Sequence, residues 1–148
     1  MASFVFDEGR RGILHGIAGT HSEIDLGADA IGAHFIDEGT DTPDQTNDVD
    51  HADRTGFNPT FANAPNLAGK SWTISSNVAV FDATDEVFTG SEALTGSTSV
   101  ESFELWKDSG TNTTSPFISN HDDYTGLPLT PSGTDVTVVF AATGIIRI

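Results

Sequence analysis

The side chains in this chain that are best suited to chemistry are its histidines and its clustered acids. Histidine occurs at five positions, which are His15, His21, His34, His51 and His121. None of them has the HExxH spacing that sets two zinc ligands and a catalytic glutamate on one helix face. His34 alternates with apolar neighbours, so we expect it on the solvent or interface face of a strand, in a structural or incidental role.

An acidic run is the densest group of potential metal ligands, and it comprises Asp41, Asp44, Asp48, Asp50 and Asp53. Calcium accepts carboxylate oxygens of this kind. However, the segment after Asp48 and Asp50 lacks the glycine and the closing glutamate of an EF-hand loop. We therefore expect a solvated acidic loop without a cofactor, and we keep Asp48, Asp50 and Asp53 as weak candidates for a calcium ion.

Glu104 is the acid with the most apolar neighbours. Strand alternation places it opposite Phe103 and Leu105 and beside Trp106. Glycoside hydrolysis needs a carboxyl with a raised pKa and a second carboxylate at a set distance, whereas most acids here lie among polar residues and glycine. The chain has no cysteine, and it has no nucleophile elbow, phosphate loop or dinucleotide fingerprint. We expect no enzyme, with no catalytic and no cofactor-binding residues.

The charge of the chain restricts its partners. Its 148 residues include 22 acidic and 6 basic ones, which gives a net charge of −16 at pH 7. Binding to nucleic acid requires basic groups that displace counterions, and an anionic membrane surface also repels a protein of this charge. We therefore expect no nucleic acid and no membrane as a partner, and we find no apolar stretch long enough for a membrane span and no signal peptide.

Short apolar bursts between turn residues predict many short strands. The expected strands are residues 30–36, 70–75, 77–81, 100–107, 116–119, 136–142 and 144–148. Helical spacing of Ile13, Leu14, Ile17 and Ala18 predicts one helix over residues 7–18. The fold class is therefore mainly β: a single domain, 1–148, with an antiparallel β-sandwich or jelly-roll-like architecture and one short N-terminal helix.

Finer features of this fold also follow from the pattern. The continuous apolar runs 77–81 and 136–142 suit strands that are buried on both faces. Residues 144–148 are expected to pair with 136–142 through a turn at Thr143-Gly144. Residues 37–68 and 120–134 are expected to form long surface loops, and the first is the better candidate for reaching a neighbouring subunit.

Aromatic residues offer one further binding chemistry. Trp72, Trp106 and Tyr124 could together form a platform on which sugar rings stack. Aromatic side chains on strands more often pack in the core or between sheets, and we prefer this second interpretation.

A series of short motifs in a set order runs through nearly the whole chain. It includes Ala30-Ile31-Gly32-Ala33-His34-Phe35-Ile36, Leu67-Ala68-Gly69-Lys70-Ser71-Trp72-Thr73, Glu104-Leu105-Trp106-Lys107-Asp108-Ser109-Gly110 and Ala142-Thr143-Gly144-Ile145-Ile146-Arg147-Ile148. This order resembles a family of small virion structural proteins of tailed bacteriophages, the capsid decoration or cement proteins. No single motif carries the resemblance; the co-linear order does.

The resemblance implies a capsid decoration (cement) protein on the outer surface of the phage head. Its partners would be the major capsid protein and copies of itself, with a trimer as one possible arrangement. The alternative is a tail or fibre component that contacts host-surface glycans, and a small hydrolase is a third class. The resemblance transfers no catalytic residues to this chain.

Overall fold

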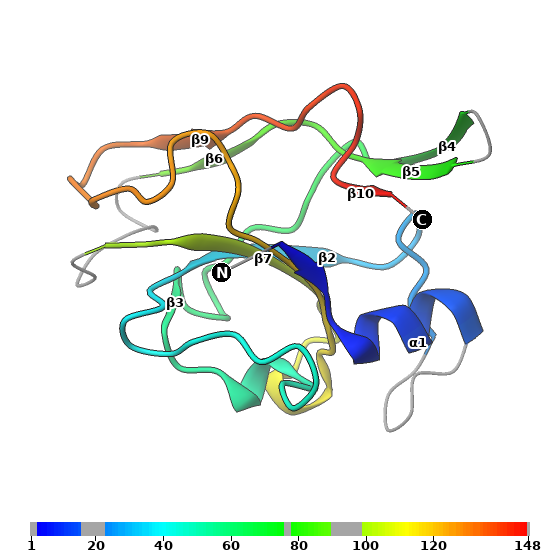
Figure 1. Ribbon diagram of the computed structural model, residues 1–148, viewed down its shortest axis with the longest axis horizontal. Helices are drawn as coiled ribbons and strands as arrows, with labels where there is room; N and C mark the ends of the chain where they lie inside the picture. Colours follow the sequence, from blue (N-terminus) through cyan, green and yellow to red (C-terminus); the bar gives the residue numbers. More distant parts are fainter. Residues whose placement is uncertain (1–2, 16–22, 76–77, 90–98, 148) are drawn as a thin grey trace.

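Alternating apolar residues build two layers of antiparallel strands that face each other across a shared core (Figure 1). The computed structural model describes residues 3–15, 23–75, 78–89 and 99–147. Within these ranges the protein is mainly β, with an α-helix near its N-terminus, and the predicted fold class is confirmed. No helix in these ranges has the length and apolar character that a membrane crossing requires.

The first layer is a five-stranded sheet with the strand order β1-β8-β7-β2-β3. Its strands are β1 (Phe4–Val5), β2 (Ile31–Ile36), β3 (Phe57–Asn58), β7 (Ser102–Lys107) and β8 (Phe117–His121). Strands β2 and β7 pair along their whole length and form the centre of the sheet. A bulge between Leu105 and Trp106 shifts the register of β7 against β8.

The second layer consists of two smaller sheets that lie side by side above the first (Figure 1). One sheet has the order β10-β5-β4, and the other pairs β6 with β9. Their bounds are β4 (Ser71–Ser75), β5 (Val78–Asp82), β6 (Glu86–Phe88), β9 (Val136–Val138) and β10 (Ile146–Arg147). The core between the layers joins Phe35 and Phe103 of the first layer to Phe81 and Phe88 of the second.

The opposite face of the five-stranded sheet is covered by helical turns and by the segment that follows β2 (Figure 1). The helical elements are α1 (Asp7–His15), η1 (His51–Asp53) and η2 (Asn112–Thr114). A Cβ atom on Gly9 would lie 2.6 Å from the backbone oxygen of Ile118. Glycine at this position therefore permits the close approach of α1 to β8.

The structure also differs from the sequence-based expectations. Strand β10 pairs with β5 and β9 pairs with β6, so the expected hairpin between residues 136–142 and 144–148 is wrong. The chain from 136 to 147 instead returns alongside both β6 and β5, because these two strands follow one another in the second layer. Complete burial of 77–81 and 136–142 is also wrong: Val78 to Val80 are half-buried, and Val139 is 63% exposed.

The predicted helix and loops are changed in part. Helix α1 ends at His15, and residues 16–18 of the prediction lie outside the described residues. The segment 37–68 is not a simple surface loop, because it contains η1 and β3 and buries His51 and Arg54 completely or nearly so. The segment 120–134 begins inside β8, where Asn120 is buried.

The unexpected pairing of β10 with β5 depends on Gly144. Its φ is +87°, its N–H donates to the carbonyl of Ala141 at 2.7 Å, and a Cβ atom there would lie 2.8 Å from the backbone oxygen of Phe81. We predict that Gly144→Ala lowers the free energy of unfolding by about 2–4 kcal/mol, since it adds a steric clash to backbone strain. Urea unfolding measures the change.

Gly110→Ala is the matched control for this prediction. Gly110 has a φ of +85°, but a Cβ atom there would meet nothing within 4 Å. Gly110→Ala should therefore lower the free energy of unfolding only through backbone strain, by about 1–2 kcal/mol. Equal losses in the two variants would contradict the pairing of β10 described here.

Candidate functional site

A cluster of polar side chains lies on the face of the five-stranded sheet that points away from the second layer. His34 of β2, Ser102 and Glu104 of β7, and Asn120 of β8 are all fully buried there. His34 and Glu104 are direct partners in the register of β2 and β7, and Asn120 is the partner of Glu104 in β8. Three neighbouring strands thus place polar groups side by side under the segment 37–64.

Aspartate side chains within the segment 37–64, which covers this face, stabilise its turns through hydrogen bonds to nearby backbone N–H groups. Asp50 caps η1 by accepting a hydrogen bond from the N–H of Ala52, and the carboxylate of Asp53 accepts one from the N–H of Asp50. Asp44 accepts from the N–H groups of Thr46 and Asn47 in the preceding turn. These short side chains satisfy backbone donors that a turn would otherwise leave unpaired. As a result η1 presents His51, and the chain directly after it presents Arg54, to the sheet.

Three of the buried groups form one hydrogen-bonded chain. Nε2 of His34 lies 2.9 Å from Oε2 of Glu104, and Nε2 of His51 lies 3.2 Å from Nδ1 of His34. With Glu104 as acceptor, each imidazole donates from Nε2, and Nδ1 of His51 is left as a bare nitrogen. Nδ1 of His51 has no partner among the described residues, which agrees with this arrangement of protons.

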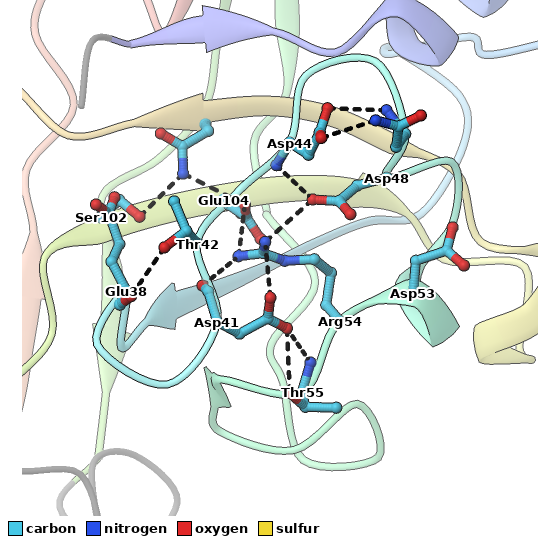
Figure 2. Close-up of polar contacts among 12 residues, drawn as sticks. Glu38, Asp41, Thr42, Asp44, Asp48, Asp53, Arg54, Thr55, Ser102 and Glu104 are labelled. Carbon is cyan, nitrogen blue, oxygen red and sulfur yellow. Dashed lines mark hydrogen bonds and ion pairs between the residues drawn. The ribbon is translucent and has the colours of Figure 1, made fainter.

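Arg54 is the cation at the centre of the cluster, and its side chain is fully buried (Figure 2). Its Nη1 donates to Asp48 at 3.0 Å and to Asp41 at 3.4 Å, and Nη2 donates to the backbone oxygen of Asp41 at 3.2 Å. Nη2 also lies 3.5 Å from Oε1 of Glu104. Asn120 completes the surroundings of Glu104 with an amide hydrogen bond of 3.3 Å.

Aromatic rings close the space around the histidines. The ring of His51 lies 4.3 Å from that of Phe57 and 4.8 Å from those of Phe61 and Trp106, between ring centres. The ring of His34 stacks on Trp106 at 4.5 Å. These contacts exclude water from the imidazoles, which strengthens each hydrogen bond and makes any added charge costly.

Burial and neighbouring charges shift the pKa values of the cluster. Burial lowers the pKa of His51 to about 3, and the proximity of His34 and Arg54 adds to this effect. Burial, followed by the charge of Arg54, holds the pKa of His34 well below its usual value. Burial raises the pKa of Glu104 to about 7, although Arg54 and Asn120 act in the opposite direction. Both histidines are therefore neutral at pH 7, while Glu104 is near its titration midpoint.

A carboxyl joined to two imidazoles is able to pass a proton along its hydrogen bonds. Here Glu104, His34 and His51 are all fully buried, so a substrate could reach them only after the segment 37–64 had been displaced. In the structure the cluster attaches this segment to the sheet.

Several sequence-based expectations about these residues change. His34 does not lie on a solvent or interface face, because the segment 37–64 covers that face of β2. Asp48 binds Arg54 and accepts from the N–H of Asp44, while Asp50 and Asp53 cap η1. The three weak calcium candidates thus make internal contacts, and within the described ranges no group of three or more His, Cys, Asp or Glu side chains could hold a metal ion.

Arg54 is the central residue that the sequence analysis missed. Its signal was its position, since it is one of only 6 basic residues and it directly follows the acidic run. Glu104 was singled out for its apolar neighbours, and it does have a raised pKa. His21 lies outside the described residues.

The aromatic platform, the less favoured interpretation of these three rings, does not form. Trp106 is 1% exposed under the covering segment, whereas Trp72 is 36% exposed on β4 of the other layer. Tyr124 packs partly buried against the core between the layers. These rings therefore cannot stack together on one sugar, and Trp72 is the most exposed of the three.

The chain was compared with protein-family models, with curated proteins and with solved structures, and none of them matches it. The function must therefore be inferred from its own residues and their geometry.

Removal of the buried cation should destabilise the protein strongly. Arg54→Met leaves Asp41, Asp48 and Glu104 beside one another without their shared partner, so we predict a loss of about 3–5 kcal/mol in the free energy of unfolding. Arg10→Met is the matched control, because Arg10 is half-exposed and pairs with Asp7 at the surface, where a change of about 0.5 kcal/mol or less is expected. Similar losses in urea unfolding would contradict the central role of Arg54.

The histidines should make the protein sensitive to acid. A lowered pKa in the folded state means that the unfolded chain takes up protons first, so stability is lost as the pH falls from about 6.5 toward 3. Glu104 acts in the opposite sense: its raised pKa gives a contribution that is full below about 4.5 and is lost as the pH rises through 7. Burial also lowers the pKa of His121, to about 4. Burial raises the pKa of Asp48 and of Glu86, so these two carboxyls act in the same sense as Glu104. The lowered pKa values of the three histidines outweigh them, and the net effect is a loss of stability in acid.

Two variants test this pH dependence by urea unfolding between pH 4.5 and 7.5. His51→Gln keeps a hydrogen-bond donor but does not titrate, so its stability should decline less steeply, by about 1.4 kcal/mol per pH unit. Glu104→Gln removes the opposing contribution and should decline more steeply than the wild type. If the free energy of unfolding changed with pH in the same way for the wild type and both variants, the cluster would not titrate as described.

Proposed function

We propose that this protein is a structural component of a tailed-phage virion, a capsid decoration (cement) protein that binds the outer surface of the head. The co-linear resemblance of the chain to small virion structural proteins suggests this role. The observation that carries it is the complete burial of Arg54, Glu104, His34 and His51, with relative exposures of 0–2%. The groups best suited to chemistry hold the covering segment in place, which favours a protein that works through contacts.

Rigidity supports the same conclusion. A long polar segment would lose much conformational entropy if it became ordered only on binding. Here the segment 37–64 is already fixed to the sheet through Arg54 and His51, and η1 is capped at its N-terminus by Asp50. A pre-organised surface of this kind suits a protein that must bind a repeating lattice in many copies.

The net charge supports a partner other than the chain itself. At −16, free copies repel one another and remain dispersed until a complementary surface binds them. The proposed partner is therefore the major capsid protein, and copies of this chain would be arranged by the symmetry of the capsid. We propose no nucleic acid or membrane as a partner.

Particle composition tests the proposal. In purified particles of the phage that encodes the chain, quantitative mass spectrometry should find it in many copies, at a fixed ratio to the major capsid protein. Particles assembled without it should bind the purified protein saturably to the same ratio. Presence in only a few copies on the tail, or absence from the particle, would refute the decoration role.

The alternative is a tail or fibre component that contacts host-surface glycans, and the exposed ring of Trp72 favours it. This alternative predicts saturable binding to host envelope polysaccharide that Trp72→Ala abolishes. Ile74→Ala is its matched control, because Ile74 lies two residues along the same strand, is 83% exposed and has no ring to stack. Absence of binding by the wild type would exclude this alternative.

A further inference from the structure

A groove of about 1070 Å³ lies between the two layers and is lined by residues of both. Strand β1 borders it on the first layer, and β9 and β10 border it on the second. The loop after β8, which includes Tyr124, Leu127 and Leu129, forms one further wall. None of the residues of the buried polar cluster lines this groove.

The lining of the groove is largely apolar. Phe103 and Ile145 belong to the main core, and Tyr124, Leu127 and Leu129 pack against that core while remaining partly exposed. The groove is therefore a place where the core between the layers opens to the outside. An apolar occupant would remove these side chains from water and gain hydrophobic stabilisation.

The groove is also lined by strands that stand at the ends of their sheets among the described residues. Strand β1 stands at the end of its sheet, and β9 and β10 each stand at the end of theirs in the described strand order. An edge strand presents backbone N–H and C=O groups that can pair with an added extended chain. An extended peptide could therefore use hydrogen bonds as well as apolar contacts here, as in β-strand addition.

The surroundings of the groove are acidic. Asp123 lines it directly. Burial, and after it the charges of Asp123, Asp82 and Asp85, raise the pKa of Tyr124 to about 12. Arg147 is the basic residue in the lining. Together with the net charge of −16, this arrangement favours an occupant that carries positive charge and disfavours a second copy of the same chain.

We propose that the groove binds an extended apolar segment of a partner protein that carries lysine or arginine beside its apolar residues. The identity of the partner rests on the proposed function: on a virion it would be the major capsid protein. The chemistry of the occupant does not rest on it, because the shape, the edge strands and the charge of the groove are properties of this chain alone.

A peptide pair tests the chemistry without any phage particle. One short fluorescein-labelled peptide alternates valine and threonine and has a lysine at each end; the other has glutamate at each end. Fluorescence anisotropy should show the lysine peptide binding at least about tenfold more tightly, and added salt should reduce the difference. Laurate, a fatty acid, is tested alongside the peptides as an apolar occupant that is not a protein. The proposal would be overturned if both peptides bound equally, if neither bound, or if only laurate bound.

Variants locate the binding on the groove. Val139→Asn changes a lining residue that is 63% exposed, so the fold should tolerate it. Leu129→Asn changes a lining residue that is partly buried against the core. Each should weaken binding of the lysine peptide about tenfold. Leu14→Asn is the matched control, because Leu14 is 61% exposed on α1 and does not line the groove. Equal weakening by Leu14→Asn, or none by Val139→Asn, would overturn the assignment to the groove.

Cross-linking on assembled particles separates this inference from the proposed function. The chain has no cysteine, so Val139→Cys and Ile74→Cys can each carry a single benzophenone. Cross-links from position 139 to a basic, apolar segment of the capsid protein support the groove as the contact. Cross-links from position 74 alone would overturn the groove as the contact site, while the decoration role would stand. A protein missing from the particles would refute the decoration role, and the peptide experiment would still decide the groove.

Discussion

The burial of one guanidinium group governs this structure. Arg54 can leave water only if carboxylates surround it, since an unpaired buried charge costs several kcal/mol. Asp41 and Asp48 come from the covering segment, and Glu104 comes from the centre of the sheet. The same ion pairs that satisfy Arg54 therefore join two parts of the chain that are far apart in sequence, and they determine where the segment 37–64 lies.

This constraint explains why both faces of the five-stranded sheet are buried although one of them carries a cluster of polar side chains beside its aromatic rings. Every residue of β2 is buried, yet His34 and Glu104 face the covering segment while Phe35 and Phe103 face the second layer. The polar face excludes water because most of its donors and acceptors are paired and aromatic rings enclose them. Among the described residues, Nδ1 of His51, Nε of Arg54 and Oδ1 of Asn120 are buried there without a hydrogen-bond partner. The cluster is stable only within a pH range, since added protons on His34 or His51 would place further charge beside Arg54.

The two sides of the molecule differ in what they offer to a partner. The covering segment is acidic and closed, whereas the groove beside β1, β9 and β10 exposes part of the core next to strands that end their sheets in the described strand order. Both properties would serve the proposed contact role, because a rigid body lowers the entropic cost of binding and a strand at a sheet end can pair with an added chain. The acidic surroundings would favour a basic partner over a second copy of the chain.

The sequence alone determined the mainly β fold, the N-terminal helix and the approximate positions of β2, β4, β5, β7 and β8, because alternation and turn residues act over a few neighbouring positions. It also pointed to Glu104 through its apolar neighbours. Only the tertiary structure decided that His34 is buried, that Asp48 binds Arg54, and that β10 pairs with β5. Each of these contacts joins distant segments, and alternation states which side of a strand a residue occupies but not what covers that side. For the same reason the acidic run looked like a solvated loop: the sequence shows its charges, and only the fold shows the arginine that they surround.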